Sequence, residues 1–121
     1  MPTVLVVDDA LFMRVTIGDL LKEYGFEVVG EATNGKEAVL LYDQLLPDLV
    51  TMDITMPIMT GIEAVQRIRA KHPDANIIMI TALGQQNKIK SAIESGAKDF
   101  ITKPFQPDQL KAVALNVLNL T

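Results

Sequence analysis

Five polar side chains stand at the ends of four short apolar runs of the sequence. They are Asp8 and Asp9 after 3–7, Asp53 in 48–53, Thr81 in 76–81 and Lys103 after 98–102. A single Asp after a strand is commonly a helix N-cap, but two adjacent acids exceed what a cap requires. Ligands of an open parallel sheet bind at the carboxyl ends of its strands, so these side chains are predicted to meet at one edge.

Three carboxylates at one edge repel one another, and something has to relieve the repulsion. Two like charges about 4 Å apart in a partly buried site raise the free energy by roughly 4 kcal/mol. Protonation or a bound cation relieves it, because one lysine does not balance three acids. The chain has no cysteine and one histidine, so its ligands would be oxygens, which favour Mg²⁺ or, as a second choice, Mn²⁺. Mg²⁺ keeps places for water and phosphate oxygens, so the site is suited to a phosphate.

A phosphate at this edge would be bound without the usual nucleotide motifs. The sequence contains neither the GxxxxGK[ST] loop nor the GxGxxG fingerprint. A carboxylate can itself be the nucleophile and form an aspartyl phosphate. Asp53 is best placed for this role because it ends an apolar and therefore buried strand. Thr81 could then donate a hydrogen bond to one phosphoryl oxygen, and Lys103 could neutralise another.

Five strand candidates alternate with five segments of helical period. The strand candidates are 3–7, 27–32, 48–53, 76–81 and 98–102. In the helix candidates, apolar residues recur three or four positions apart, as Met13, Ile17 and Leu21 do in the first. This alternation predicts an α/β fold with a doubly wound parallel sheet covered by helices on both faces. Periodicity alone does not give the strand order, and five units are too few for an eight-stranded barrel.

Composition limits the classes of function. At 121 residues the chain is expected to be one domain, 1–121. Its net charge is −4 and its pI is about 4.8, which argue against a nucleic-acid surface. Without cysteine there is no disulfide or thiolate site, and no apolar run is long enough for a membrane span. A cytoplasmic protein, without nucleic acid or membrane as a partner, is therefore expected.

Four stretches resemble bacterial response-regulator receiver domains. They are the acidic pair after the first strand, MDITMPIMTG at 52–61, ITA at 80–82 and FITKPF at 100–105. Their spacing fits as well, and the resemblance covers essentially the whole chain. The phrases GEATNGKEAV, GQQ at 84–86 and KDFITKPFQP are similar to those of non-enteric chemotaxis regulators in particular. The resemblance implies a flavodoxin-like fold with five parallel strands in the order 2-1-3-4-5.

The resemblance also implies a phosphoacceptor and a metal site. Asp53 would be the residue that is phosphorylated. Asp9, Asp53 and the backbone carbonyl of Thr55 would bind Mg²⁺ directly, and Asp8 would act through a water molecule. Thr55 lies at a position that varies across the family and tunes the lifetime of the phosphorylated state.

The remaining site residues would bind the phosphoryl group and report its presence. Thr81, the amide of Ala82 and Lys103 would hold the phosphoryl oxygens, and the bond from Lys103 to Pro104 would be cis. Phe100 occupies the aromatic switch position together with Thr81. It lacks a tyrosine hydroxyl, so a switch here would rest on ring packing alone.

The function implied is a phosphorylation-activated signalling switch rather than an enzyme in the ordinary sense. A CheA-like histidine kinase would supply the phosphoryl group, and the domain would assist the transfer and its own slow dephosphorylation. The surface of the fourth helix, fifth strand and fifth helix would then bind an output protein, with the flagellar motor switch as the expected target. A separate phosphatase is a further possible partner, and a monomer is expected. A phosphorelay shuttle and the receiver of a longer regulator remain alternatives.

Two other classes stay open from the residues alone. A phosphatase of the haloacid-dehalogenase type also uses a strand-end Asp with Mg²⁺, although it requires a second acid where this chain has Thr55. A flavodoxin-like FMN carrier would share the architecture, but an acidic edge repels the FMN phosphate. Phosphomonoester turnover would favour the first class, and a yellow colour on purification the second.

Overall fold

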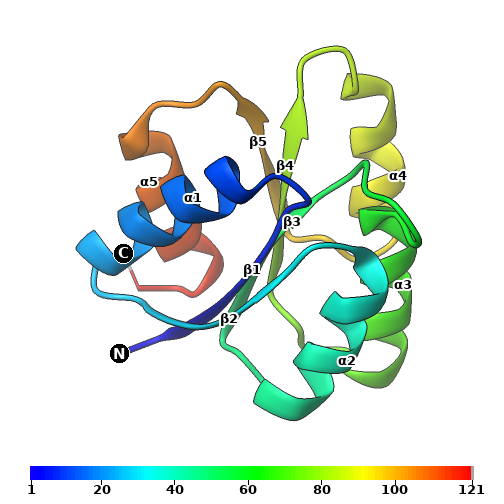
Figure 1. Cartoon of the computed structure of the whole chain (residues 1–121), viewed down its shortest axis with the longest axis horizontal. Coiled ribbons are helices and arrows are strands. Elements are labelled where there is room, and N and C mark those ends of the chain that lie inside the picture. Colours follow the sequence, from blue (N-terminus) through cyan, green and yellow to red (C-terminus); the bar gives the residue numbers. More distant parts are fainter. Residues whose placement is uncertain (121) are drawn as a thin grey trace.

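Five parallel strands form one sheet in the order β2-β1-β3-β4-β5 in the computed structural model, which describes residues 1–120. The strands are β1 (Thr3–Val7), β2 (Glu27–Ala32), β3 (Leu49–Asp53), β4 (Ile77–Ala82) and β5 (Asp99–Lys103). The helices that follow them in turn are α1 (Leu11–Glu23), α2 (Gly35–Leu45), α3 (Gly61–Lys71), α4 (Ile89–Glu94) and α5 (Pro107–Val117). Figure 1 shows α1 and α5 on one face of the sheet and α2, α3 and α4 on the other. The predicted fold and strand order are confirmed.

The strands lie within one residue of their predicted positions. The runs 3–7 and 27–32 are matched at both ends, and the last two strands are displaced by one residue. The run 48–53 loses its first residue, because Asp48 N donates to Thr3 Oγ1 at 3.0 Å and its carboxylate accepts from Thr3 N at 2.8 Å. Asp48 is thus hydrogen-bonded to the start of β1 rather than to a partner strand of the sheet.

Across residues 1–120, every helix is too short or too polar to span a lipid bilayer.

The fourth helix is the shortest of the five. A 3₁₀ turn at Gln86–Lys88 precedes α4, which has 6 residues. Gly96 follows with a φ of 120°, a left-handed backbone conformation that glycine commonly adopts where a helix ends. Pro107 lies in the first turn of α5, and Gln106 N donates to Gln109 Oε1 at 2.9 Å at this N-terminus.

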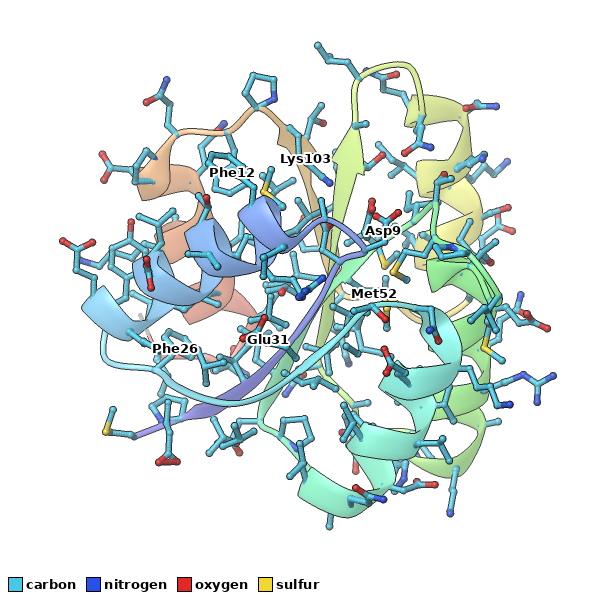
Figure 2. All side chains as sticks on the ribbon, in the orientation of Figure 1. Asp9, Phe12, Phe26, Glu31, Met52 and Lys103 are labelled. Carbon is cyan, nitrogen blue, oxygen red and sulfur yellow. The ribbon has the colours of Figure 1, made fainter. Side chains whose placement is uncertain are left out.

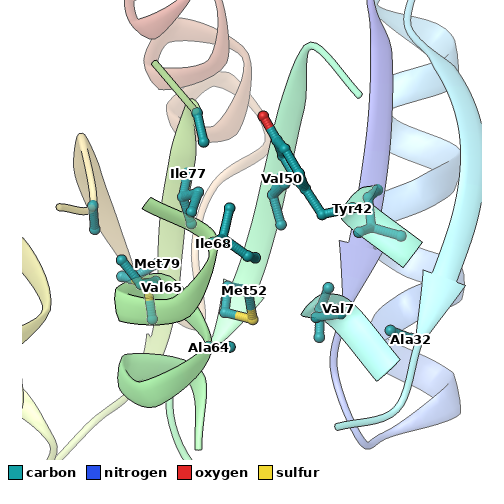
Figure 3. Packing of buried hydrophobic residues seen from close by; sticks show 14 of the residues in the cluster. Val7, Ala32, Tyr42, Val50, Met52, Ala64, Val65, Ile68, Ile77 and Met79 are labelled. Carbon is teal, nitrogen blue, oxygen red and sulfur yellow. The ribbon is translucent and has the colours of Figure 1, made fainter. Parts of the chain in front are cut away.

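Alternate residues of each strand pack on opposite faces of the sheet. In β1, Val4 and Val6 belong to the buried cluster that α1 and α5 cover. Leu5 and Val7 belong to the cluster under α2, α3 and α4, which is shown in Figure 3 with Met52 at its centre. Both faces of the inner strands β1, β3 and β4 are therefore buried, which explains why these strands are mostly apolar. The edge strands β2 and β5 are less buried and carry charged residues.

Gly61 begins α3 where the helix touches the backbone at the end of β3. Its amide donates to Ile54 O at 2.7 Å. A Cβ at position 61 would overlap the carbonyl oxygen of Asp53 and lie 2.9 Å from its carbonyl carbon. Because these are backbone atoms, no side-chain rotation relieves the overlap. A glycine is therefore required to bring α3 against the end of β3.

Gly61→Ala is expected to lower the free energy of unfolding by about 3 kcal/mol, because the added methyl forces α3 away from Asp53. Gly18→Ala in α1 is the matched control. A Cβ there has Val28 Cγ2 at 3.9 Å as its nearest neighbour. Alanine at position 18 should stabilise the protein by about 0.5–1 kcal/mol. Urea denaturation measures both values, and equal effects of the two substitutions would contradict the steric argument.

Candidate functional site

Asp8, Asp9 and Asp53 meet at the carboxyl edge of the sheet, where the sequence placed them. One carboxylate oxygen of each residue lies within 4.8 Å of those of the other two. Asp8 and Asp53 are buried, with exposed fractions of 1% and 6%, whereas Asp9 is exposed. Figure 2 shows Asp9 at the same end of the sheet as Lys103. The cluster therefore combines two shielded carboxylates with one that solvent can reach.

Lys103 brings one positive charge into this cluster. Its Nζ lies 3.0 Å from Asp8 Oδ2 and 3.6 Å from Asp53 Oδ1. The lysine side chain is itself only 18% exposed. When all three carboxylates are ionised, this ammonium leaves two negative charges unbalanced. The peptide bond from Lys103 to Pro104 is cis, as the resemblance implied.

Contacts that the sequence did not reveal fix Asp8. Asp8 N donates to Ala32 O at 3.1 Å, and Asp8 Oδ1 accepts from Ala10 N at 2.9 Å. Arg14 Nη1 donates to Asp8 O at 2.8 Å, while its Nε donates to Glu31 Oε1 at 3.0 Å. Elements α1 and β2 thus both hold the acidic turn. A single arginine in a helical segment gives no sequence signal for such a bond, because its acceptor is a backbone oxygen.

Burial raises the pKa of the Asp53 carboxyl from its ordinary 3.8 to about 6. Lys103 opposes this rise, and the negative charge of Asp8 adds to it. The Ile54 amide, which donates to Asp53 Oδ1 at 2.8 Å, also opposes the rise, and Asp9 contributes to it. The carboxyl that ends the central strand β3 therefore has a pKa closer to neutrality than an ordinary aspartate.

In metal-free buffer the contribution of Asp53 to the stability of the protein is expected to fall as the pH rises from about 4 to about 6. The folded state holds the proton of Asp53 more tightly than the unfolded chain does, so the stabilisation is complete below the unfolded pKa of 3.8 and lost above the folded pKa of about 6. Asp53→Asn should remove this dependence and raise the free energy of unfolding near neutral pH by about 1–2 kcal/mol. The full shift corresponds to about 3 kcal/mol, which solvent screening at the sheet edge reduces.

Urea denaturation with a chelator at several pH values measures this effect. Asp99→Asn is the matched control, because Asp99 Oδ1 also accepts from the next amide, Phe100 N, at 2.7 Å, yet Asp99 is not fully buried. Asp99→Asn should leave in place the fall in stability that is attributed to Asp53. A parent protein whose stability rises with pH over this range would contradict the direction of the shift.

Thr81 lies at the strand end next to Asp53. Strands β3 and β4 are paired with Asp53 opposite Ile80, so Thr81 comes one residue later. Thr81 is fully buried, with an exposed fraction of 0%, whereas Ala82 at the end of β4 is exposed. The Thr81 hydroxyl donates towards Ala82 O at 3.3 Å. The structure therefore brings the predicted hydroxyl to the edge that carries the carboxylates.

Phe100 lies on the same face of the sheet as Thr81. Its neighbour Ile101 packs in the cluster of α1 and α5, so Phe100 points to the opposite face. Met79 is paired with Phe100 and belongs to the cluster of that opposite face. Thr81 is two residues beyond Met79 and shares its face. Phe100 is 40% exposed.

Gln85 connects two of the predicted residues, although sequence reasoning assigned it no contact. Its Nε2 donates to Thr55 Oγ1. Its Oε1 accepts a long hydrogen bond from Thr81 Oγ1, at 3.5 Å. In the sequence, GQQ at 84–86 indicated only a resemblance. The contact of Gln85 with Thr55 could not be predicted, because no spacing rule links these two positions. This bridge joins the loop after β3 to the loop after β4.

The donor set of the cluster fits a hard divalent cation. The clustered ligands are carboxylate oxygens, their negative charge exceeds that of the nearby ammonium, and Asp9 is open to solvent. Such a set suits Mg²⁺ or Mn²⁺. The cluster contains no sulfur ligand and the sequence has no cysteine, so this donor set does not favour a soft metal.

The response regulator receiver domain family matches residues 4–115, and the chain belongs to this family. Receiver domains are phosphoacceptor switches of two-component systems that bind Mg²⁺ at an acidic pocket. Membership decides between this class and the phosphatase and flavin-carrier classes that the residues alone left open.

The chain is similar to proteins named chemotaxis protein CheY. It is 57% identical to that of Listeria monocytogenes over 106 residues, which are 88% of this chain and 89% of the relative. It is also 53% identical over 115 residues to a protein of Bacillus subtilis named CcdB, covering 94% of this chain and 96% of that one. A solved structure, the CheX-CheY-BeF3-Mg complex from Borrelia burgdorferi, matches 95% of this chain and 87% of that chain with a TM-score of 0.90 and 36% identity.

Proposed function

We propose that the protein is a single-domain switch, 1–121, in which Asp53 accepts a phosphoryl group from a histidine kinase. The observation that carries this proposal is the convergence of three carboxylates within 4.8 Å, with Lys103 Nζ at 3.0 Å and 3.6 Å from two of them. Asp53 is the buried acid at the end of a central strand, and its side chain is fixed by the Ile54 amide. These features support a positioned nucleophile.

In the proposed transfer, an Asp53 carboxylate oxygen forms a P–O bond while the P–N bond of a phosphohistidine breaks. The imidazole leaves and takes up a proton. Lys103, which already lies beside Asp53, would stabilise the charge on one phosphoryl oxygen. The Thr81 hydroxyl and the Ala82 amide would donate hydrogen bonds to the other oxygens.

Asp9, Asp53 and the backbone carbonyl of Thr55 would hold Mg²⁺ or Mn²⁺, with Asp8 acting through water. When bound, the cation neutralises charge on the phosphoryl oxygens. Asp8 would meanwhile keep its ion pair with Lys103, and Arg14 would keep the Asp8 backbone in place.

The proposed output is a change at α4, β5 and α5. Thr81 would turn towards the phosphoryl group, and the Phe100 ring on the same face would move into the space that it leaves. A partner that prefers the changed surface shifts the equilibrium only by its differential affinity.

The similarity to CheY proteins supports a CheA-like kinase as the phosphoryl donor and a flagellar motor switch or another output protein as the target. It also supports a cytoplasmic location and a monomer. The Borrelia complex of CheX with CheY supports a phosphatase or other regulator as a further partner. The similarity to CcdB keeps other receiver roles, including a phosphorelay shuttle and a receiver within a longer regulator, as the alternative.

The test is to incubate the protein with acetyl phosphate and to weigh the intact chain. One phosphoryl group should be added with Mg²⁺ present, and little or none in a chelator. An unchanged mass in both conditions would overturn the proposal. Binding of the phosphorylated form to a flagellar-switch peptide would then favour the chemotaxis role, and transfer to a phosphotransferase histidine would favour the relay.

A further inference from the structure

The carboxamide of Gln85, which lies in the loop after β4, contacts two threonines that flank the proposed phosphorylation site. Its Nε2 donates to Thr55 Oγ1 in the loop after β3, and its Oε1 faces Thr81 Oγ1 at the end of β4. Gln85 is only partly buried, whereas Thr81 is fully buried. The Gln85 side chain therefore links the two threonines and reaches from the partly exposed surface to the buried Thr81 hydroxyl.

The Thr81 hydroxyl is held weakly in this arrangement. Its single proton has two acceptors, Ala82 O at 3.3 Å and Gln85 Oε1 at 3.5 Å. Both distances exceed the 2.7–2.8 Å or so that is typical of O–H···O bonds. A phosphoryl oxygen would offer a charge-assisted bond that is shorter and roughly twice as strong. A phosphoryl oxygen could therefore replace Ala82 O and Gln85 Oε1 as the acceptor of the Thr81 hydroxyl.

We infer that Gln85 is a positioning residue that holds the Thr81 hydroxyl in the resting state and must release it when Asp53 is phosphorylated. This inference rests on the proposed function. The bond to Thr55 fixes the carboxamide, so its Oε1 stays directed at Thr81 rather than rotating into solvent. Gln85 therefore opposes the movement of Thr81 and weakens the binding of a phosphoryl group or its mimic.

The expected size of this effect follows from the hydrogen bond that is lost. A net neutral hydrogen bond corresponds to a factor of about two to twelve in an equilibrium constant. The Thr81 contact is long, so the effect should lie at the lower end. Gln85→Ala is expected to strengthen binding of beryllofluoride with Mg²⁺ about threefold.

Calorimetric titration with beryllofluoride and Mg²⁺ tests the inference. Gln86→Ala is the matched control, because the Gln86 carboxamide bonds Gly84 N at 2.9 Å within its own loop and should leave the affinity unchanged. In a Thr81→Val background, Gln85→Ala should have no effect, since the hydroxyl that it frees is absent. A thermal unfolding scan of each variant verifies that the chain is folded.

The outcomes separate the two proposals. If the parent fails to bind beryllofluoride, or binds it equally well after Asp53→Asn, the proposed function fails. If the parent binds and Gln85→Ala matches it, the role of Gln85 is overturned. Equal gains from Gln85→Ala and Gln86→Ala, or a gain that persists in the Thr81→Val background, would also overturn it, because loosening of the loop would then be sufficient.

Discussion

Asp53→Asn is expected to abolish phosphorylation of the protein by acetyl phosphate with Mg²⁺. An amide has no anionic oxygen with which to form an acyl phosphate, so the intact mass should remain that of the unmodified chain. Loss of folding is not expected, since the Asn side-chain oxygen can accept the 2.8 Å hydrogen bond from Ile54 N that Asp53 Oδ1 accepts. Removal of a buried charge should even stabilise the variant near neutral pH.

The control for this prediction is Asp99→Asn, which changes an acid that caps its own neighbouring amide away from the carboxylate cluster. It should be phosphorylated like the parent. Peptide mapping after reductive trapping of the acyl phosphate identifies the modified residue. Labelling of Asp53→Asn at the parental rate would show that another acid is the acceptor.

Lys103→Met is expected to slow phosphorylation by a factor on the order of 100 to 1,000, the effect of removing one preorganised group that stabilises developing charge. Methionine preserves most of the apolar stem and removes the ammonium that lies 3.0 Å from Asp8 and 3.6 Å from Asp53. The free energy of unfolding should also fall by about 2 kcal/mol, because the buried Asp8 carboxylate loses its partner. Initial rates from intact mass and urea denaturation measure the two effects.

Lys98→Met is the matched control, because Lys98 is exposed and lies just before β5. It should leave both the rate and the stability near those of the parent. Asp53→Asn and Lys103→Met should therefore change stability in opposite directions near neutral pH. A stabilising effect of Lys103→Met would contradict the view that the cluster has an excess of negative charge.

The carboxylate cluster unites these expectations. Burial raises the pKa of Asp53, and the negative charges of Asp8 and Asp9 add to this rise while Lys103 opposes it. The excess of negative charge also gives Lys103 its stabilising role, and the carboxylates provide ligands for a divalent cation. The repulsion between these like charges destabilises the fold, and it is relieved when Asp53 is protonated or when a cation binds, alone or with a phosphoryl group. Without a bound cation, the cluster is therefore expected to destabilise the fold and to favour binding of a cation.

The alternation of strands and helices, and the edge of the sheet at which the site lies, could be predicted from the sequence alone. Period and apolar runs are local signals, and they place strand boundaries within one residue. The carboxyl ends of parallel strands necessarily share an edge, so Asp8, Asp9, Asp53 and Lys103 could be grouped before any contact was seen. The residues alone also suggested Mg²⁺ at the acids, Asp53 as the nucleophile and Lys103 at a phosphoryl oxygen, whereas the direct metal ligands and the aromatic switch came from resemblance.

The contacts that position the site residues became known only from the tertiary structure. The bond from Arg14 to Asp8 O and the bridge of Gln85 between Thr55 and Thr81 join segments whose spacing follows no periodic rule. The requirement for glycine at position 61 likewise arises from backbone atoms of Asp53. A pattern of side-chain types carries information on burial and local geometry, whereas these contacts depend on backbone acceptors and loop paths that exist only after the sheet has assembled.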